Sequence, residues 1–282
     1  MPELPEVETV KRGIEPALKG KVITRAQAMV PKLRFDIPAG FSQYLTGRTV
    51  VNLRRRSKYI LIDLDNDTVL LNHLGMSGSF RVYGPNEEAE TKKHDHVILE
   101  TSDGYHLHYN DPRRFGMMDI FKREDEATHP LLCHMGPEPM DEALTAAYLK
   151  QKFGGRKTAI KTALLDQKNI AGLGNIYVCE ALNRSGISPK RMAGNISKPR
   201  LEVLVSHIKQ VIDDAIQAGG SSLKDHKKTD GTMGYFQHSF KAYDRAGQPC
   251  QMVDKNDKPC SGTIQRMVQT GRSTFYCPRC QK

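Results

Sequence analysis

Apolar residues recur at helical spacing near the start of the chain. They are Val7, Val10, Ile14 and Leu18. A period of about 3.6 residues predicts a helix with one buried face, and Gly20 would end it. Pro5 suits the first position of this helix, where its missing N–H costs nothing, and Glu6 suits the positive end of the helix dipole. The pattern therefore places the amino terminus at the start of a packed helix.

Between residues 22 and 122 the pattern changes to short runs rich in β-forming residues. We expect strands over residues 50–56, 59–64, 68–74, 96–101 and 105–109. Residues 65–67 (Asp-Asn-Asp) and 102–104 (Ser-Asp-Gly) supply the turns between neighbouring strands. This arrangement predicts a β-sandwich with the first helix packed on it.

The second half of the chain reads as helical. Residues 129–139 hold three prolines and a glycine, which predicts a linker. An apolar stripe at Leu201, Leu204, Ile208, Val211, Ile212 and Ala215 then predicts a long helix. Gly219 and Gly220 would end that helix, and the polar, glycine-containing segment from 220 to 236 predicts a mobile loop.

The charge of the chain changes the picture of its partners. Its 282 residues include 42 Lys and Arg against 32 Asp and Glu, a net charge of +10. From Phe236 onward, eight basic residues and three aspartates give +5, half of that excess. This balance favours a polyanionic partner. No run approaches the ~18 apolar residues of a membrane span, and no signal peptide is apparent, so we expect a cytosolic protein without a membrane partner.

The first residues carry candidate chemistry. Removal of the initiator methionine would leave Pro2 with a free secondary amine, next to the carboxylate of Glu3. A neutral amine is a nucleophile towards an electrophilic carbon, and an adjacent acid can deliver a proton. Since α-amino groups have a pKa of roughly 8, the neutral form is accessible. The alternative is an ordinary amino terminus followed by a capped helix.

Two glycine-containing segments carry further candidates, although the first of them is, as a bare pattern, an ordinary glycine turn. Residues 160–177 read as helix, glycine turn and helix, with Asn175 as the N-cap of the second helix. Free N–H groups at that helix start would bind one phosphate, and Lys152 and Lys157 lie upstream as phosphate ligands. Met76 lies in residues 73–78 and Phe115 lies in residues 110–116. From the residues alone, both would be core residues.

Four cysteines near the carboxyl end have the arrangement of a metal site. Cys277 and Cys280 form a C-x2-C pair, and sixteen residues separate Cys260 from Cys277, which suits a zinc ribbon. Nine residues separate Cys250 from Cys260, a long spacing for a first pair. Closing the longer loop costs only about 1 kcal/mol more, so we still predict one structural zinc ion on all four thiolates.

The remaining candidates near these cysteines are weaker. Asp254 and Asp257 are poor substitutes for a thiolate ligand, because zinc ribbons use sulfur and nitrogen. We expect Cys133 and Cys179 to be buried, inert thiols. His94 and His96 could bind a metal, but no third ligand is apparent.

Residues 2–10, Pro-Glu-Leu-Pro-Glu-Val-Glu-Thr-Val, resemble the opening of the formamidopyrimidine-DNA glycosylase family, which repairs oxidised purines. The resemblance continues in family order to the carboxyl end. It implies that Pro2 is the nucleophile, Glu3 the catalytic acid and Lys58 a catalytic lysine. Without it, Lys58 in the run 54–59 would read as a solvated basic hairpin that touches phosphates.

The same resemblance assigns DNA contacts. Enzymes that act on a base inside a duplex must fill the hole that the flipped base leaves. Family positions that do so match Met76, Arg113 and Phe115, and a further DNA-contacting position matches His94. Asn175 matches a residue that contacts the DNA backbone in a helix-two-turns-helix element. Arg272 matches an arginine that reaches phosphates, and the loop from 219 to 236 matches one that closes over the everted base.

Together these features predict an α+β multidomain chain. Its parts are an N-terminal catalytic β-sandwich domain (1–132), a helical helix-two-turns-helix DNA-binding domain with the lesion loop (133–235) and a zinc-ribbon module (236–282). The resemblance implies a bifunctional DNA glycosylase and abasic-site lyase in base excision repair, acting as a nucleoid-associated monomer on double-stranded DNA with oxidised bases. Two alternatives stay open: a glycosylase of the same superfamily for oxidised pyrimidines, and a non-catalytic zinc-ribbon DNA-binding protein.

Overall fold

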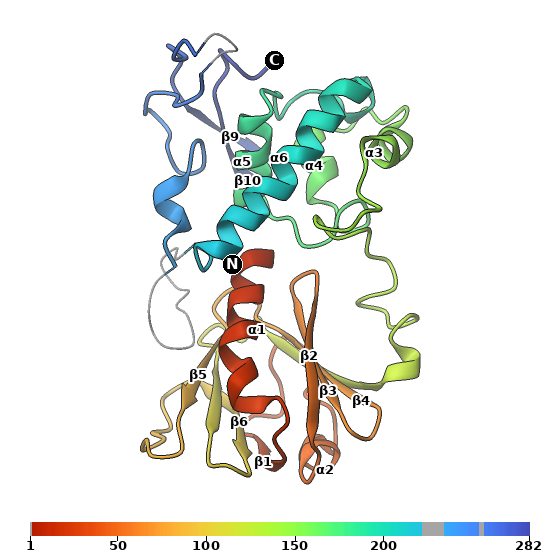
Figure 1. Ribbon diagram of the computed structural model, residues 1–282, viewed down its shortest axis with the longest axis vertical. Helices are drawn as coiled ribbons and strands as arrows, with labels where there is room; N and C mark the ends of the chain where they lie inside the picture. The colour runs from red at the N-terminus through yellow and green to blue at the C-terminus, as the bar shows by residue number, and fades with distance from the viewer. Residues whose placement is uncertain (1, 222–233, 254–256) are drawn as a thin grey trace. The chain divides into compact units, whose positions relative to one another are not determined.

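The computed structural model describes residues 2–221, 234–253 and 257–282 (Figure 1). The chain forms two compact units. The first contains Met1–Cys133 and Ala218–Tyr235, and the second contains His134–Gln217 and Phe236–Lys282. The sequence assigned 218–235 to the helical domain, whereas the structure groups this segment with the first unit. The division into three domains at 132 and 235 stays a prediction.

The first unit is built from two four-stranded antiparallel sheets and the helix α1 (Leu4–Leu18). One sheet has the strand order β1-β6-β7-β5, and the other has the order β2-β3-β4-β8 (Figure 1). The strands are β1 (Ile23–Ala28), β2 (Val50–Arg56), β3 (Tyr59–Leu64), β4 (Thr68–His73), β5 (Ser79–Tyr83), β6 (Asp95–Thr101), β7 (His106–Asn110) and β8 (Met117–Lys122). A short helix α2 (Phe41–Leu45) and a 3-10 turn η1 (Arg123–Asp125) complete this unit's regular elements among the described residues.

A single hydrophobic core joins both sheets of this unit to α1. Its members include Ile14 of α1, Ile62 of β3 and Leu107 of β7, each at most 1 % exposed. The predicted apolar face of α1 is buried, because its members recur on the side of the helix that meets the sheets. The β-sandwich with a packed helix is confirmed. The bounds of β2 and β3 match the prediction, and those of β4, β6 and β7 differ from it by one residue.

The second unit is helical and ends in a two-stranded hairpin. Its helices are α3 (Ala146–Phe153), α4 (Ile160–Leu165), α5 (Asn175–Arg184) and α6 (Lys198–Gln217), with 3-10 turns η2 (Ala193–Asn195) and η3 (Phe236–Ser239). The hairpin consists of β9 (Gln265–Gln269) and β10 (Arg272–Tyr276). The predicted apolar stripe lies on the buried face of α6, and residues 129–139 form no helix or strand, as a linker requires.

Two expectations from the sequence are wrong. The N-cap of α5 is Gly174, with an extended backbone, and Asn175 is the first helical residue because its side chain is drawn to another backbone group. Cys133 is exposed, because it lies in a surface turn after η1, whereas Cys179 is buried as expected. The predicted lesion loop falls mostly on residues 222–233, which lie outside the described residues. Within the described chain, no helix is long and apolar enough to cross a bilayer.

Candidate active site and nucleic-acid interface

The amino-terminal residues are enclosed by the first unit. Pro2 and Glu3 are both buried, and Glu3 is the N-cap of α1 with an extended backbone. The N–H of Glu3 donates to Oε2 of Glu6 at 2.9 Å, and the carbonyl of Glu3 accepts from the N–H of Val7 at 3.1 Å. The Glu3 side chain in turn accepts from the backbone N–H of Glu6, so two glutamates spaced three residues apart form a reciprocal capping box. It fixes Glu3 and hence the direction in which Pro2 leaves the helix.

The second carboxylate oxygen of Glu6 reaches a segment far along the chain. Its Oε1 accepts from the backbone N–H of Ser221 at 2.8 Å and from the Ser221 hydroxyl at 2.9 Å. Gly220 has a φ of +76° and little free space around it, since a Cβ there would lie 3.1 Å from the same oxygen. A side chain at 220 would therefore meet both backbone strain and the carboxylate. Glu6 supports the site by tying α1 to residues 220–221, at the base of the predicted lesion loop.

Lys58 lies in a two-residue turn between β2 and β3. Arg56 pairs with Tyr59, and Ser57 adopts a φ of 55°, which places both turn residues close to the strand ends. Lys58 is only 9 % exposed. The alternative of a solvated basic hairpin is therefore wrong for this side chain, because a lysine left to touch phosphates freely would stay exposed.

A salt bridge connects this turn to α1. Nε of Arg55 lies 3.0 Å from Oε2 of Glu8, and Nη1 of Arg55 donates to the carbonyl of Ser57 at 2.9 Å. Burial alone would raise the pKa of Glu8, but Lys11, Arg12 and Arg55 together hold it below its ordinary value. The ionised carboxylate thus anchors the arginine that supports the turn carrying Lys58.

His73 is a candidate that the sequence reading did not single out. It ends β4 opposite Tyr59, with the two ring centroids 4.9 Å apart. Burial, and then the charges of Lys58 and Arg34, lower the pKa of His73 to about 4. Its Nδ1 accepts from the N–H of Gly75 at 3.0 Å, so the proton of the neutral ring lies on Nε2. The signal that could have identified His73 is the predicted pairing of its strand with the strand that follows Lys58.

Met76, Arg113 and Phe115 lie on two neighbouring loops of the first unit. Phe115 is 43 % exposed, so the alternative of a core position is wrong for it, and Met76 is half-buried. The guanidinium of Arg113 lies 4.8 Å from the centroid of the Phe115 ring. The loops touch directly, because a Cβ on Gly75 would lie 2.3 Å from the carbonyl carbon of Phe115. An exposed arginine stacked on an exposed aromatic ring suits insertion between bases.

His94 lies beside these loops in the left-handed backbone region, with a φ of 74°. Its ring centroid is 6.2 Å from that of His96. The only grouping of potential metal ligands found among the described residues consists of cysteines, so the alternative of a metal site at the two histidines is wrong for the described chain.

The second unit carries the other predicted DNA contacts. Arg272 is exposed and follows Thr270 and Gly271, which form a two-residue turn with φ values of 46° and 73°. Nδ2 of Asn175 donates to the carbonyl of Ser273 at 2.9 Å, so α5 holds the hairpin that presents Arg272. Buried Lys161 supports the same hairpin through the Ser273 carbonyl at 3.0 Å.

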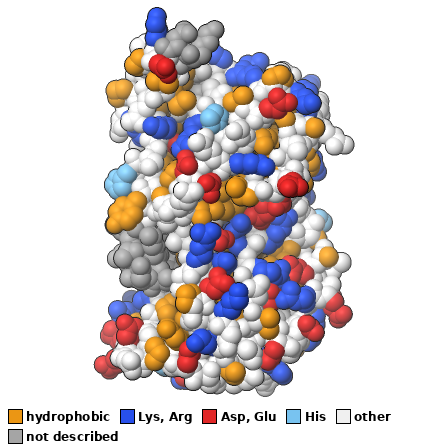
Figure 2. Space-filling view, in the orientation of Figure 1, with side chains coloured by type: hydrophobic (Ala, Val, Ile, Leu, Met, Phe, Trp, Pro, Cys, Tyr) orange, Lys and Arg blue, Asp and Glu red, His pale blue; other side chains and the backbone are white. Residues whose placement is uncertain are grey.

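Two further lysines of this unit are on the surface. Lys152 lies on α3 with its Nζ 5.8 Å from the centroid of the Tyr148 ring, and Lys157 lies in the segment before α4. Both are exposed, as a phosphate ligand requires. On the face seen in Figure 2, Lys and Arg side chains alternate with Asp and Glu over both units, so the net charge of +10 does not form one patch on that face.

The four cysteines meet at one point in the second unit. The sulfur atoms of Cys250, Cys260, Cys277 and Cys280 all lie within 4.8 Å of one another. The sulfur distances are 3.7 Å both for Cys250 to Cys280 and for Cys260 to Cys277. A tetrahedron with Zn–S bonds of about 2.3 Å has S–S edges of about 3.8 Å. The geometry therefore fits a tetrahedral zinc site, with Cys250 as a full member.

The long spacing after Cys250 is closed by local pairing. The N–H of Cys260 donates to the carbonyl of Met252 at 2.8 Å, and Val253 forms a bridge with Pro259. The base of the inserted segment is thus a short ladder that returns the chain to the metal site. Asp257 is exposed and is not part of the cysteine group, and Asp254 lies outside the described residues.

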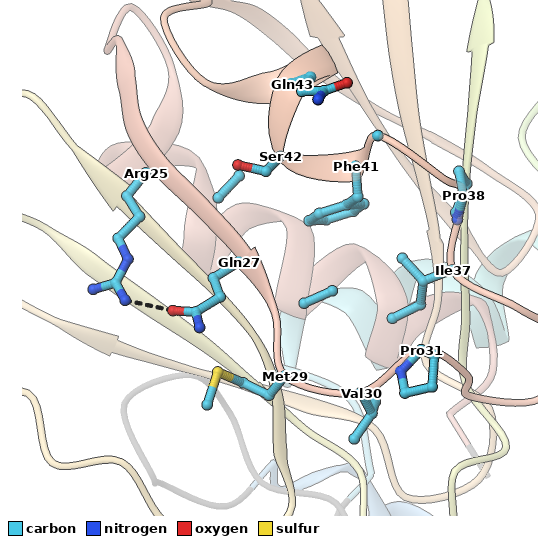
Figure 3. Close-up of a pocket in the computed structure, with 13 residues that line it drawn as sticks. Arg25, Gln27, Met29, Val30, Pro31, Ile37, Pro38, Phe41, Ser42 and Gln43 are labelled. Atoms are coloured by element: carbon cyan, nitrogen blue, oxygen red, sulfur yellow. Dashed lines mark hydrogen bonds between the residues drawn. The ribbon is translucent and has the colours of Figure 1, made fainter.

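The first unit also has a cavity of about 670 Å³ beside β1, lined in part by Arg25, Gln27, Met29 and Phe41 (Figure 3). Figure 3 shows the Arg25 side chain hydrogen-bonded to Gln27, and Arg25 also pairs with Glu100. None of the predicted site residues lines this cavity. Its lining has no nucleophile paired with an acid or base, so it is not the candidate active site.

Comparison with known families accounts for these groups of residues. Residues 1–118 match the formamidopyrimidine-DNA glycosylase N-terminal domain, and residues 135–227 match the H2TH domain of the same family. Residues 258–282 match the zinc finger found in FPG and IleRS. That last match begins after Cys250, so the structure, and not the match, brings Cys250 into the metal site.

Full-length relatives and solved structures agree. The chain is 52 % identical to a formamidopyrimidine-DNA glycosylase of Phenylobacterium zucineum and 53 % identical to one of Rhizobium johnstonii, each over 100 % of both chains. It superposes on a Lactococcus lactis FPG mutant in complex with a Fapy-dG containing DNA, with a TM-score of 0.89, 32 % identity and full coverage of both chains. A structure of MutM with carbocyclic 8-oxo-G containing DNA gives 0.87 at 33 % identity, again over both whole chains.

The two sheets with a buried amino-terminal proline, the helical unit and the cysteine site together define a DNA-repair glycosylase fold. The chain belongs to the formamidopyrimidine-DNA glycosylase family.

Proposed function

We propose that this protein is a bifunctional DNA glycosylase and abasic-site lyase of base excision repair, which removes oxidised purines such as 8-oxoguanine and formamidopyrimidines. The observation that carries the proposal is the enclosed start of α1. There Pro2 immediately precedes Glu3, and Glu3 is the buried N-cap residue of α1. A protein that only binds DNA does not need a buried acid next to its terminal amine.

The proposed reaction begins with the Pro2 amine. Its nitrogen attacks C1′ of the sugar, and the glycosidic bond breaks as the damaged base leaves. Glu3 protonates the ring oxygen, the ring opens, and an iminium links Pro2 to C1′. Successive β and δ eliminations then break the strand on both sides of the lesion. The covalent intermediate replaces one difficult displacement with easier steps.

Lys58 and His73 assist from one side of the same unit. The family resemblance assigns Lys58 proton transfer and handling of the opened sugar, and its enclosure in a turn that Arg55 supports is consistent with that role. Because Nδ1 of neutral His73 accepts from Gly75, its Nε2–H is available as a donor to a phosphate oxygen. Arg272, Asn175, Lys152 and Lys157 supply backbone contacts from the second unit, and Met76, Arg113 and Phe115 fill the vacated stack.

Zinc has a structural part in this proposal. The four thiolates would hold one ion, which supplies the cross-link that a small module needs to stay folded. Cys277 directly follows β10, the strand that begins at Arg272. Zinc binding at the cysteines would therefore also order the hairpin that presents Arg272 to a phosphate.

Two other functions are tested by the same substrates. A related Lactococcus lactis structure, at 33 % identity and a TM-score of 0.87, is described as a complex with an oxidized pyrimidine containing DNA. Excision rates on duplexes that contain 8-oxoguanine, a formamidopyrimidine or an oxidised pyrimidine therefore show which lesion the enzyme prefers. A non-catalytic zinc-ribbon protein would bind all of them and cleave none. We further propose that the enzyme acts as a monomer on the nucleoid, which sedimentation with and without duplex DNA checks.

The decisive test is trapping of the covalent intermediate with borohydride on lesion-containing DNA. Wild-type protein should form a stable adduct, and Pro2→Gly should bind the same duplex with little adduct, because a primary amine on a flexible residue replaces the held secondary amine. Peptide mapping of the wild-type adduct should place the sugar on Pro2. Wild-type adduct levels from Pro2→Gly would move the nucleophile elsewhere, with Lys58 the first candidate.

A further inference from the structure

Asp111 follows β7 and is fully buried, although no step of the proposed reaction uses it. Its Oδ1 accepts from the hydroxyl of Ser77 at 2.6 Å, and its Oδ2 accepts from the N–H of Gly116 at 2.7 Å. Tyr109 donates a longer bond of 3.5 Å to the same Oδ2. One carboxylate therefore binds the loop that contains Met76 and the loop that contains Phe115.

The backbone of Asp111 adds a third segment. Its N–H donates to the carbonyl of His94 at 3.0 Å, and its carbonyl oxygen accepts from the N–H of Arg114 at 3.1 Å. The same carbonyl lies 3.0 Å from Nε2 of His96. Thus residues 74–79, 94–96 and 111–116 share a single hydrogen-bond centre. These segments carry the three predicted base-stack contacts of the first unit, together with the predicted DNA contact at His94.

The packing around this centre leaves no slack. A Cβ on Gly116 would lie 1.8 Å from the hydroxyl of Tyr109, and one on Gly78 would lie 2.4 Å from that hydroxyl. Ser77 closes the network, because its hydroxyl also accepts from the N–H of Arg113 at 3.3 Å. Burial raises the pKa of Tyr109 well above its ordinary value, so this hydroxyl stays a neutral donor. Movement of one loop must therefore displace the other.

A buried carboxylate is costly unless donors satisfy it. Here the donors come from the two loops themselves, so the carboxylate is satisfied only while both loops hold this arrangement. Apolar packing holds only part of these loops, since Leu74 is buried in the core whereas Phe115 and Arg113 are exposed. The buried carboxylate adds a polar link at the base of the exposed part.

We propose that Asp111 is a positioning residue that fixes the loops 74–79 and 111–116 to each other, so that Met76, Arg113 and Phe115 enter the duplex as one preassembled wedge. The proposal rests on the proposed glycosylase function of this unit. Groups that are ordered before binding do not lose that freedom during insertion. Loss of the centre should therefore slow formation of the flipped state more than it weakens initial binding to DNA.

The test uses Asp111→Asn, which keeps the shape but leaves one acceptor oxygen, so that the bonds from Ser77 and Gly116 can no longer be accepted by separate oxygens. Asp103→Asn is the matched control, because Asp103 is a carboxylate in the turn at the other end of β7, bonded to Thr101 at 2.9 Å. With full-length zinc-loaded protein, we expect single-turnover excision from an 8-oxoguanine duplex to fall at least tenfold for Asp111→Asn and less than twofold for Asp103→Asn. Ser77→Ala should fall in between.

A double-mutant cycle separates positioning from general damage. If Asp111 acts through the wedge, Asp111→Asn should slow excision by less than threefold in a Phe115→Ala background. Fluorescence of 2-aminopurine next to the lesion should rise more slowly in Asp111→Asn at unchanged affinity for undamaged duplex. Additive losses in the cycle, or an unchanged 2-aminopurine rate, would overturn the proposal.

A measurement without DNA tests the link between the two loops separately from the proposed glycosylase function. Amide hydrogen exchange over residues 111–117 should accelerate at least tenfold in Asp111→Asn, and exchange in α1 should not change. If wild-type protein fails to excise any lesion while this acceleration is seen, the glycosylase function fails and the link between the loops stands. If excision is normal in wild type and exchange is unchanged in the variant, the positioning role of Asp111 is wrong.

Discussion

The role of each side chain in this site depends on its surroundings more than on its residue type. Glu3 and Glu6 lie three residues apart in one helical turn and are both about 2 % exposed. Both carboxylate oxygens of Glu6 accept hydrogen bonds, one from Glu3 and one from Ser221. We therefore assign Glu6 a supporting role. His73 differs from His94 in its neighbours. The His73 ring lies 4.9 Å from the Tyr59 ring, and the charges of Lys58 and Arg34 act on it.

His73 gives a prediction for stability against pH. The histidine takes up a proton near pH 6.5 in the unfolded chain but only near pH 4 in the folded protein. Between these values the unfolded state binds more protons, so stability falls as the pH decreases. We expect the free energy of unfolding to lose roughly 1 to 2 kcal/mol between pH 7 and pH 5 through this group, and His73→Gln to lose less over that range.

Urea unfolding of both proteins at the two pH values measures this difference. His238→Gln, in η3 of the second unit, serves as the control for a histidine in another setting. Equal pH slopes for wild type and His73→Gln would show that His73 titrates alike in the folded and unfolded states.

At the scale of elements, α1 and the β2–β3 turn are the two parts that must be kept in register. Arg55 connects them through Glu8 on the helix and the Ser57 carbonyl in the turn. The opposed loops of the wedge have a similar arrangement around Asp111. In both cases polar side chains link neighbouring elements by specific hydrogen bonds in addition to apolar packing.

Arg55→Lys tests the first of these connections. Lysine keeps the charge but lacks the planar fork that bonds two acceptors at once. We expect the rate of borohydride trapping to fall by roughly 3- to 10-fold, as expected for about 1 kcal/mol of lost positioning. Arg12→Lys is a matched control, because Arg12 bonds the same Glu8 at 2.8 Å but is not bonded to the turn. Equal rates for the two variants would remove the positioning role of Arg55.

The wedge itself gives a second prediction at this scale. Phe115→Ala and Met76→Ala should each slow excision from duplex DNA more than they weaken nonspecific binding. Wedge residues stabilise the flipped state, whereas phosphate contacts supply most of the sequence-independent affinity. Single-turnover excision and binding to undamaged duplex are the two measurements. Parallel losses in both would indicate that these residues only support the fold.

At the scale of the whole molecule, the residues of the proposed function are divided between the two units. The proposed amine, acid, Lys58 and base-stack wedge belong to the first unit, and Arg272 with the cysteine site belongs to the second. The last 47 residues, from Phe236, have a small core, consisting of the cysteines with Ala242, Ile264 and Phe275. Such a core does not support an independent module without a cross-link.

Zinc removal should therefore abolish lesion binding and leave the first unit folded. Cys277→Ser should have the same effect, and Cys250→Ser is the sharper test because of its unusual spacing. Metal content per chain and affinity for lesion DNA are the measurements, and circular dichroism follows the first unit. Cys133→Ser, at an exposed thiol outside the group, is the control. Full zinc and full affinity in Cys250→Ser would exclude Cys250 as a ligand.

The sequence by itself determined the elements and the chemical groups of this protein. The apolar face of α1, the runs that became β2 and β3, and the C-x2-C pair are local patterns, and local spacing is enough to specify them. The family resemblance at residues 2–10 then predicted Pro2 and Glu3 as catalytic residues, and the resemblance at residues 54–59 predicted Lys58. These residues could be found because they lie in short, distinctive segments.

The tertiary structure decided how those groups are held. Glu6 meets Ser221 across 215 positions, and Asp111 meets Ser77 across 34, so neither pairing appears in any local pattern. The neutral state of His73 depends on burial and on cations brought near by strand pairing. Asn175 was misassigned as an N-cap because its partner, the carbonyl of Ser273, is 98 positions away. Side-chain types follow from local spacing, but burial and hydrogen-bond partners exist only after the chain has packed.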